Sequence, residues 1–215
     1  MYKLNIKNWN ILTKILALSL IAIIPFTFFL FLEILPSFKE NMLDDKRDNI
    51  KQAVEVAYGI ISNLEKDYRD NKITFQDAQK EAIHQIQEIR FGEDNYFWIN
   101  DDYPNMIMHP FKPELNGKSL RDLKDPNGVF LFNEMAKICK LNGDGYVDYY
   151  WPKPGYEKPV PKISYVKYFK DWNWIIGAGL YIDDVDEKIA DITSRVFLIF
   201  GILAFISSVI VIISS

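Results

Sequence analysis

Two long apolar runs bracket a polar middle section in this chain of 215 residues. The runs, residues 15–35 and 196–213, are each about long enough to cross a bilayer core of roughly 30 Å as a helix that rises about 1.5 Å per residue. Pro25 and Glu33 interrupt the first run, whereas the second contains no charged residue. The pattern therefore predicts two transmembrane helices.

Three lysines precede the first run: Lys3, Lys7 and Lys14. By the positive-inside rule they predict a cytoplasmic N-terminus, residues 1–14, and an extracytoplasmic domain, residues 36–195. We expect residues 214–215 to form a cytoplasmic end without an output domain. A cleaved signal peptide would also start with basic residues, but the long run and the lack of a small-x-small cleavage site favour an uncleaved anchor.

Helical spacing continues into the first part of the middle section. Apolar residues recur every three or four positions through residues 36–70, which predicts a long helix that continues from the first span. Thr74 and Asp77 resemble a capping box and open a second predicted helix. Arg90 follows Ile86 by four residues, so we expect Arg90 at the C-terminal end of the apolar stripe of that helix.

After Gly92 the period of the pattern changes to two, which is typical of strands. A third helix, residues 129–140, interrupts the series of strands. Because most neighbouring strands are joined by hairpins or short loops, the simplest architecture is an α+β fold: an antiparallel five-stranded sheet with helices packed against it. The five predicted strands are residues 96–100, 105–109, 146–151, 162–169 and 172–182.

Composition narrows the classes of function. The net charge of −4 is mild and provides no basic surface, so we discount nucleic acid as a partner. No catalytic motif is visible, and two histidines with the single Cys139 make a zinc site improbable; we therefore expect no enzyme, no cofactor and no metal. Cys139 itself fits a small buried apolar residue. The aromatic share of 15% suits a core or a ligand pocket.

Arg90 is the strongest candidate for a ligand-binding residue. A guanidinium at the edge of an apolar face offers a rigid fork of donors that matches a carboxylate, and burying it without a partner would be costly. The alternative is an arginine that reaches the surface or pairs with a nearby acid such as Glu93 or Asp94.

The predicted strands carry further candidates. Alternation places Tyr96 and Trp98 on one strand face, and Tyr149 with Trp151 on one face of another strand. His109 ends a strand just before a proline, where an imidazole donor would suit an anion. Each of these residues could equally be structural.

Lys162 and Tyr165 share the fourth predicted strand, and strict alternation places them on opposite faces. Unless a bulge near Pro161 intervenes, one of the two lies outside any common pocket.

Several ordered segments between residues 38 and 186 carry a family resemblance: RFGEDNYFWIND, MIMHPFKPELNGKSL, KDPNG, GYVDYYWPKPG, EKPVPKISYVKYF and WNWIIGAGLYIDDVD. They resemble the single Cache domain of bacterial methyl-accepting chemotaxis receptors and sensor kinases. The resemblance implies a PAS-like antiparallel sheet behind a long membrane-proximal helix, a pocket for small organic acids and a place in the bacterial cytoplasmic membrane. By position, it brings six candidates near that pocket: Arg90, Tyr96, Trp98, His109, Lys162 and Tyr165.

Receptors of this family continue past the second span into a HAMP segment and a signalling domain, whereas this chain stops at Ser215. We therefore expect a missing cytoplasmic signalling domain or partner, and a homodimer through the long first helix, although no clean heptad supports it. The main hypothesis is a sensor that binds a short carboxylate. The alternative is an extracytoplasmic interaction module for a partner protein, for which an exposed apolar patch would be expected in place of a closed pocket with inward polar groups.

Overall fold

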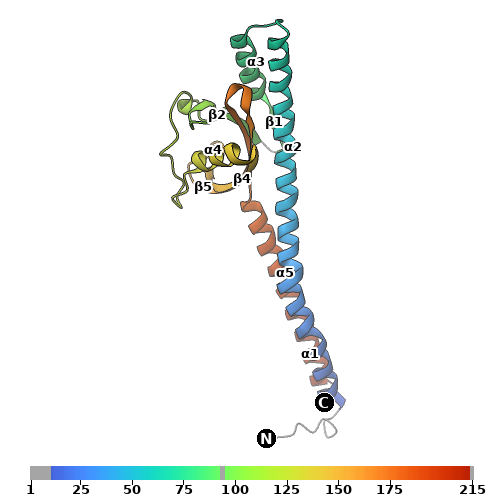
Figure 1. The fold of residues 1–215 in the computed structure, drawn as a ribbon. Coiled ribbons are helices and arrows are strands. Elements are labelled where there is room, and N and C mark those ends of the chain that lie inside the picture. Colours follow the sequence, from blue (N-terminus) through green and yellow to red (C-terminus); the bar gives the residue numbers. More distant parts are fainter. Residues whose placement is uncertain (1–10, 93–94, 214–215) are drawn as a thin grey trace. The chain divides into compact units, whose positions relative to one another are not determined.

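The computed structural model describes residues 11–92 and 95–213, and the chain divides into two compact units (Figure 1). One unit comprises Met1–Met42 and Asp184–Ser215, and the other comprises Leu43–Asp183. Lys3 and Lys7, on which the predicted membrane orientation rests, lie outside the described residues.

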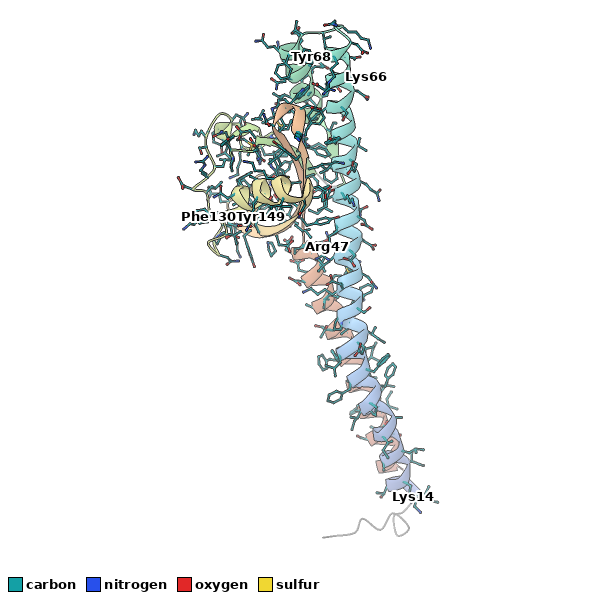
Figure 2. The ribbon with its side chains drawn as sticks, viewed as in Figure 1. Lys14, Arg47, Lys66, Tyr68, Phe130 and Tyr149 are labelled. Atoms are coloured by element: carbon teal, nitrogen blue, oxygen red, sulfur yellow. The ribbon has the colours of Figure 1, made fainter. Side chains whose placement is uncertain are left out.

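The first unit consists of two helical segments with apolar surfaces. The rings of Phe31 and Phe197 stack with centroids 4.9 Å apart, and Lys39 Nζ lies 2.6 Å from a carboxylate oxygen of Asp186. Many side chains of these segments project outward (Figure 2). The elements are α1 (Ile11–Phe29), the short π-helix η2 (Leu30–Ile34), the start of α2 (Leu35–Arg69) and α5 (Asp183–Ile213).

Both helical segments are long and apolar enough to cross a membrane. Their apolar stretches are not buried inside the protein, as expected of helices that contact lipid and not of a soluble core helix. Pro25 lies inside α1, and Glu33 lies in η2. The two predicted spans therefore correspond to two candidate membrane helices, while their orientation stays a prediction.

The second unit is built on one antiparallel sheet with strand order β1-β2-β6-β5-β4, and β3 pairs with β2 beside this path. All five predicted strands are present, and the sixth strand in the described residues is the two-residue β1. The strands are β1 (Arg90–Phe91), β2 (Asn95–Asp101), β3 (Met106–Met108), β4 (Asp144–Pro152), β5 (Pro159–Phe169) and β6 (Trp174–Tyr181).

Helices cover the two faces of the sheet separately (Figure 1). The part of α2 from Ile50 to Ile61 and the helix α3 (Phe75–Glu88) contribute to the core on one face. The helix α4 (Leu131–Asn142) contributes to the core on the other face, where Cys139 is buried as predicted. Two short 3-10 helices, η3 (Pro113–Leu115) and η4 (Lys170–Trp172), lie in the connections.

Local signals account for the limits of several elements. The hydroxyl of Thr74 accepts a hydrogen bond from the Asp77 backbone N–H and donates to the Asp77 carboxylate, which confirms the predicted cap of α3. α4 is capped by Gly143, the residue after its end, where a φ of 89° favours glycine. The turn into β6 uses Asn173 at a φ of 54°.

The predicted helical position of Arg90 is wrong. α3 ends at Glu88, Ile89 has an extended backbone, and Arg90 pairs with Tyr96 in β1. The side chain of Arg90 turns back to the end of α3, where helical carbonyl groups lack partners within the helix. The guanidinium of Arg90 donates to the carbonyl oxygens of Gln87 at 2.6 Å and Ile89 at 2.9 Å, where a cation also interacts favourably with the helix dipole.

Candidate ligand-binding site

A cavity of about 240 Å³ opens between the start of β2, the segment after β3 and the loop that joins β4 to β5. Ligand pockets for drug-sized molecules typically have volumes of about 300–1,000 Å³, so this cavity suits a smaller molecule. Its lining residues are Tyr96, His109, Phe111, Lys112, Glu114, Trp151 and residues 152–157. We call this cavity, together with the adjoining Lys162, the lysine pocket.

Lys162 is hydrogen-bonded to Tyr96, and Tyr96 lines the cavity. Its Nζ donates to the hydroxyl of Tyr96 at 3.1 Å, and its side chain is only 1% exposed. The same nitrogen lies 4.3 Å, 4.9 Å and 5.5 Å from the ring centroids of Tyr96, Tyr181 and Trp98. In the described part of the chain, no carboxylate forms an ion pair with Lys162. Aromatic faces attract a cation but do not neutralise it, so a charged Lys162 would be stabilised further by an anion.

Two glycines of β6 provide the space for these side chains. A Cβ atom built at Gly179 would overlap with Ser164 Oγ and approach Cε of Lys162 to 2.5 Å. A Cβ atom at Gly177 would overlap with the indole ring of Trp98. Glycine is therefore required at both positions if Lys162 and Trp98 are to lie across β6.

His109 is held as a neutral donor. Its Nδ1 accepts hydrogen bonds from the backbone N–H groups of Phe111 at 3.2 Å and Lys112 at 3.0 Å, so the ring proton lies on Nε2. Burial, together with the charges of Lys162 and Lys112, lowers the pKa of His109 to about 3. At neutral pH the imidazole therefore supplies one N–H donor and no charge.

The tyrosines of the site remain protonated donors. Burial raises the pKa of Tyr96 well above its ordinary value and raises the pKa of Tyr181 to about 12. The hydroxyls of Tyr149 and Ser164 lie 2.9 Å apart, and the hydroxyl of Tyr181 donates to the Pro152 carbonyl at 2.8 Å. Hydroxyl, imidazole and ammonium donors therefore gather at one place, which is the chemistry that holds an anion.

The outer part of the cavity carries charges of both signs. Lys112 and Lys153 line it together with Glu114 and Glu157. Lys153 forms an ion pair with Asp183 at 2.7 Å. The charge balance of the mouth is thus near neutral, and the positive character of the pocket comes from its deep end.

Six of the eight predicted site residues lie together on the α4 face of the sheet: Tyr96, Trp98, His109, Tyr149, Trp151 and Lys162. Tyr165 lies on the opposite face, in the core formed with α2 and α3, and its ring centroid is 4.9 Å from that of Tyr146. The register of β5 is regular past Pro161, so the expected alternation of Lys162 and Tyr165 is confirmed and the structure does not bring Tyr165 to the pocket.

Arg90 lies at the margin of the site. Its side chain is exposed, and its guanidinium carbon lies 4.9 Å from the ring centroid of Phe111, which lines the cavity. The acids suggested as alternative partners, Glu93 and Asp94, lie outside the described residues. Any contact between Arg90 and a ligand stays a prediction.

Sequence reasoning missed several residues of the site: Phe111, Lys112, Ser164, Gly177, Gly179 and Tyr181. One signal was available. Gly177 and Gly179 alternate within an otherwise apolar strand, and glycine inside a strand often marks the close approach of another group. Phe111 and Lys112 belong to a loop whose path no periodicity reveals.

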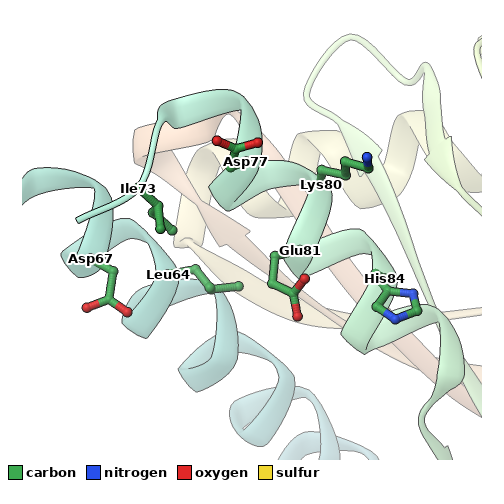
Figure 3. A pocket seen from close by; sticks show the side chains of 7 residues that line it. All are labelled: Leu64, Asp67, Ile73, Asp77, Lys80, Glu81 and His84. Carbon is green, nitrogen blue, oxygen red and sulfur yellow. The ribbon is translucent and has the colours of Figure 1, made fainter. Parts of the chain in front are cut away.

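A second cavity, of about 600 Å³, lies between α2 and α3 (Figure 3). Leu64 and Ile73 give it an apolar part, whereas the charged residues that line it include more acids than bases: Asp67, Asp77, Glu81 and Lys80, with His84. The carboxylates have partners, since they bond Lys72, Thr74 and Gln85 respectively. Among the described residues, no group of three or more His, Cys, Asp or Glu is arranged to hold a metal ion. This cavity therefore fits an anion poorly.

A twisted antiparallel sheet, with a long helix on one face and a small donor-lined pocket on the other, defines a class of ligand-sensing domain. Comparison with known families identifies the member of this class: the model of the Cache domain (dCache_2) matches residues 31–198. The chain belongs to the Cache domain family.

Relatives of this chain are bacterial receptors. The methyl-accepting chemotaxis protein McpP of Pseudomonas putida is 38% identical over 150 residues, which are 70% of this chain and 28% of that protein. The sensor histidine kinase MctS of Rhizobium johnstonii is 31% identical over 150 residues, which are 69% of this chain and 32% of that protein. The matched part thus spans less than a third of the length of either relative.

Among solved structures, a Cache chemosensory domain studied for its recognition of carboxylic acids matches this chain with a TM-score of 0.65 and 41% identity. The match covers 67% of this chain and 98% of that one. These comparisons support the predicted α+β, PAS-like fold and the predicted kind of protein, a sensor domain of chemotaxis receptors and kinases.

Proposed function

We propose that the domain binds a short carboxylate in the lysine pocket. The observation that carries this proposal is Lys162, a buried amine that donates to a tyrosine and, when charged, has no acidic partner among the described residues. Leaving a buried charge without a counter-ion is unfavourable, and a ligand carboxylate would supply the missing charge. The solved relative that recognises carboxylic acids supports the same class of ligand.

Within the pocket, the carboxylate would accept hydrogen bonds from the Lys162 ammonium, the Tyr96 hydroxyl and the Nε2–H of His109. The hydrogen bond from Lys162 Nζ to the Tyr96 hydroxyl already brings two of these groups together. The short apolar part of the acid would contact the rings of Trp151 and Phe111, which line the cavity. Arg90 would act through its contact with Phe111, at the margin of the site.

We further propose that the domain is extracytoplasmic, is held in the bacterial cytoplasmic membrane by α1 and α5, and signals to a cytoplasmic domain or partner. α2 packs on the sheet and α5 follows β6 directly along the chain, so both could transmit a change in the sheet to a membrane segment. A ligand shifts such an equilibrium only by its difference in affinity for the two states. A homodimer through α2 would place two such domains side by side.

The rival hypothesis, a module for a partner protein, has less support. The exposed large apolar side chains described within Leu43–Asp183 come from many elements: Val56, Tyr68, Phe75, Tyr103, Phe111, Phe130, Leu141 and Tyr156. The pocket, in contrast, gathers inward polar groups among aromatic rings. This arrangement favours a small molecule.

Binding of acetate, propionate and pyruvate to the full chain in nanodiscs tests the proposal. Thermal unfolding measures the stabilisation by each acid, and calorimetry measures its Kd. An acid at a hundred times its Kd should stabilise the folded state by about 2.7 kcal/mol. Lys162→Met should remove the effect. Lys167→Met is the matched control, because Lys167 lies on the same strand but pairs with Glu55 of α2 at 2.7 Å.

Two results would contradict the proposal. One is the absence of stabilisation by every acid of the panel. The other is a folded Lys162→Met variant that binds an acid as tightly as the unmodified chain does.

A further inference from the structure

The amine of Lys162 is surrounded by groups that carry no negative charge at neutral pH. Its strand neighbour on the same face is Ser164, whose hydroxyl is paired with that of Tyr149. The titratable groups that face the lysine come from every element packed around it: Tyr96 of β2, His109 and Lys112 of the segment after β3, Tyr149 of β4 and Tyr181 of β6. The acids Glu114 and Glu157 line the adjoining cavity, and Asp183 of α5, which helps to raise the pKa of Tyr181, is paired with Lys153.

This environment disfavours the ammonium form. Burial lowers the pKa of Lys162 to about 7. The hydrogen bond to Tyr96 does not require a charge, because a neutral amine also donates an N–H. The three nearby aromatic rings are compatible with either form. The unliganded pocket can therefore contain a neutral lysine.

We propose that the pocket takes up its carboxylate together with a proton, which binds to the amine of Lys162 as the anion enters. This inference rests on the proposed function and adds to it a regulation by pH. The balance of the step is simple. One carboxylate anion and one proton leave the solvent, the amine nitrogen becomes an ammonium, and the net charge of the occupied site does not change.

His109 is not the proton acceptor. Its Nδ1 already accepts two backbone N–H groups, and its Nε2 already carries the ring proton. Charging this ring would require the loss of both backbone hydrogen bonds. The tyrosines are protonated throughout the neutral range, so Lys162 is the one group described at the deep end whose charge can change there.

The direction of the pH effect follows from linkage. Below the pKa of the unliganded lysine the amine is already charged, so affinity does not depend on pH. Above it, each binding event must also bind a proton, and affinity for the anion falls about tenfold per pH unit until the pKa of the liganded state is reached. The domain would thus respond to carboxylate more strongly in mildly acidic surroundings.

Calorimetry of propionate binding tests this inference on the full chain in nanodiscs. Titrations between about pH 6 and pH 9, in pairs of buffers with different ionisation enthalpies, give both Kd and the number of protons taken up. Propionate itself is ionised across this range, since carboxyl groups titrate near pH 4. We expect an uptake close to zero at about pH 6 that approaches one proton at about pH 8.5, with Kd rising in parallel.

Two variants locate the proton. Lys162→Arg keeps a permanent charge, so its affinity should be independent of pH and its proton uptake should be absent. His109→Asn should bind more weakly but keep the pH slope, because the amine is unchanged. If Lys162→Arg does not fold, the number of protons that the unmodified chain takes up with propionate still tests the coupling.

The outcomes separate this inference from the proposed function. Propionate that binds with a constant Kd and no proton uptake overturns the coupling and leaves the proposed function standing. If neither propionate nor the other acids of the panel bind at any pH, both fail.

Discussion

Glu65 and Lys162 are buried charged groups next to aromatic rings on opposite faces of the sheet, but their partners differ. On the α2 face, Glu65 accepts hydrogen bonds from the indole N–H of Trp172 and from Arg69 Nε, the latter at 2.8 Å. On the α4 face, Lys162 is bonded to the neutral Tyr96. Glu65 thus has a cationic partner, whereas Lys162 has no carboxylate partner within residues 11–92 and 95–213.

Under the proposed function, this difference separates a structural charge from a functional one. A buried ion pair costs desolvation but supplies its own compensation, and loss of one partner is destabilising. A buried charge without a partner lowers stability and persists where it serves binding or chemistry. The comparison therefore predicts opposite responses when each charge is removed.

The largest effect is expected for Lys162→Met. Propionate affinity should fall by about a hundredfold or more, because the ligand would lose the only cation described at the deep end. The free energy of unfolding without ligand should stay the same or rise, since a buried amine is replaced by an apolar chain of similar length. Calorimetry and denaturant unfolding measure the two quantities, and a large loss of stability would argue that Lys162 is structural.

Glu65→Ala should show the reverse pattern. The indole N–H of Trp172 and the guanidinium of Arg69 would lose their acceptor, which should lower the free energy of unfolding by about 1–3 kcal/mol. Propionate affinity should change less than twofold, because Glu65 belongs to the other face of the sheet. A large change in affinity at unchanged stability would break the comparison.

Gly179→Ala tests the space that Lys162 occupies. The added methyl group would overlap with Ser164 Oγ and crowd Cε of Lys162, so we expect propionate affinity to fall by about tenfold, or about 1.4 kcal/mol. Gly59→Ala is the matched control, since nothing lies within 4 Å of a Cβ atom at that helical position. This control should keep the affinity and gain up to about 1 kcal/mol of stability. Equal behaviour of the two variants would contradict the role given to Gly179.

Arg90→Ala should have the smallest effect on binding. Its guanidinium is already bonded to the carbonyls of Gln87 and Ile89 and touches the site only through Phe111. We expect propionate affinity to fall less than about threefold, together with a stability loss of about 0.5–1 kcal/mol from the end of α3. A loss of affinity as large as that of Lys162→Met would show that Arg90 contacts the ligand directly.

Periodicity predicted most of the fold because alternation is a local property. It assigned Lys162 and Tyr165 to opposite faces, and it paired Tyr149 with Trp151 on one face, as the structure has them. It failed at Arg90, because the choice between one more helical residue and a strand depends on a partner, Tyr96, that lies in another strand.

The chemistry of the site was less predictable than the fold. The properties of Lys162 depend on the groups around its amine. Two of them, Tyr96 and Tyr181, lie 66 and 19 positions away along the chain, in other strands. The cavity wall also includes the loop residues 152–157, whose course depends on turn geometry and not on a repeating pattern. Sequence spacing gave the candidates, and tertiary packing decided among them.

The two glycines of β6 also determine how this site can diversify. A pocket wall made of side chains can be enlarged by trimming them, but Gly177 and Gly179 have nothing left to remove, so the main chain of β6 sets a hard limit on that side. Under the proposed function, a change in the size of the acid would therefore come from side chains that line the cavity, such as Phe111 and Trp151, or from the loop of residues 152–157. Redesign of the domain for longer acids would begin with Phe111 and Trp151, which line the cavity.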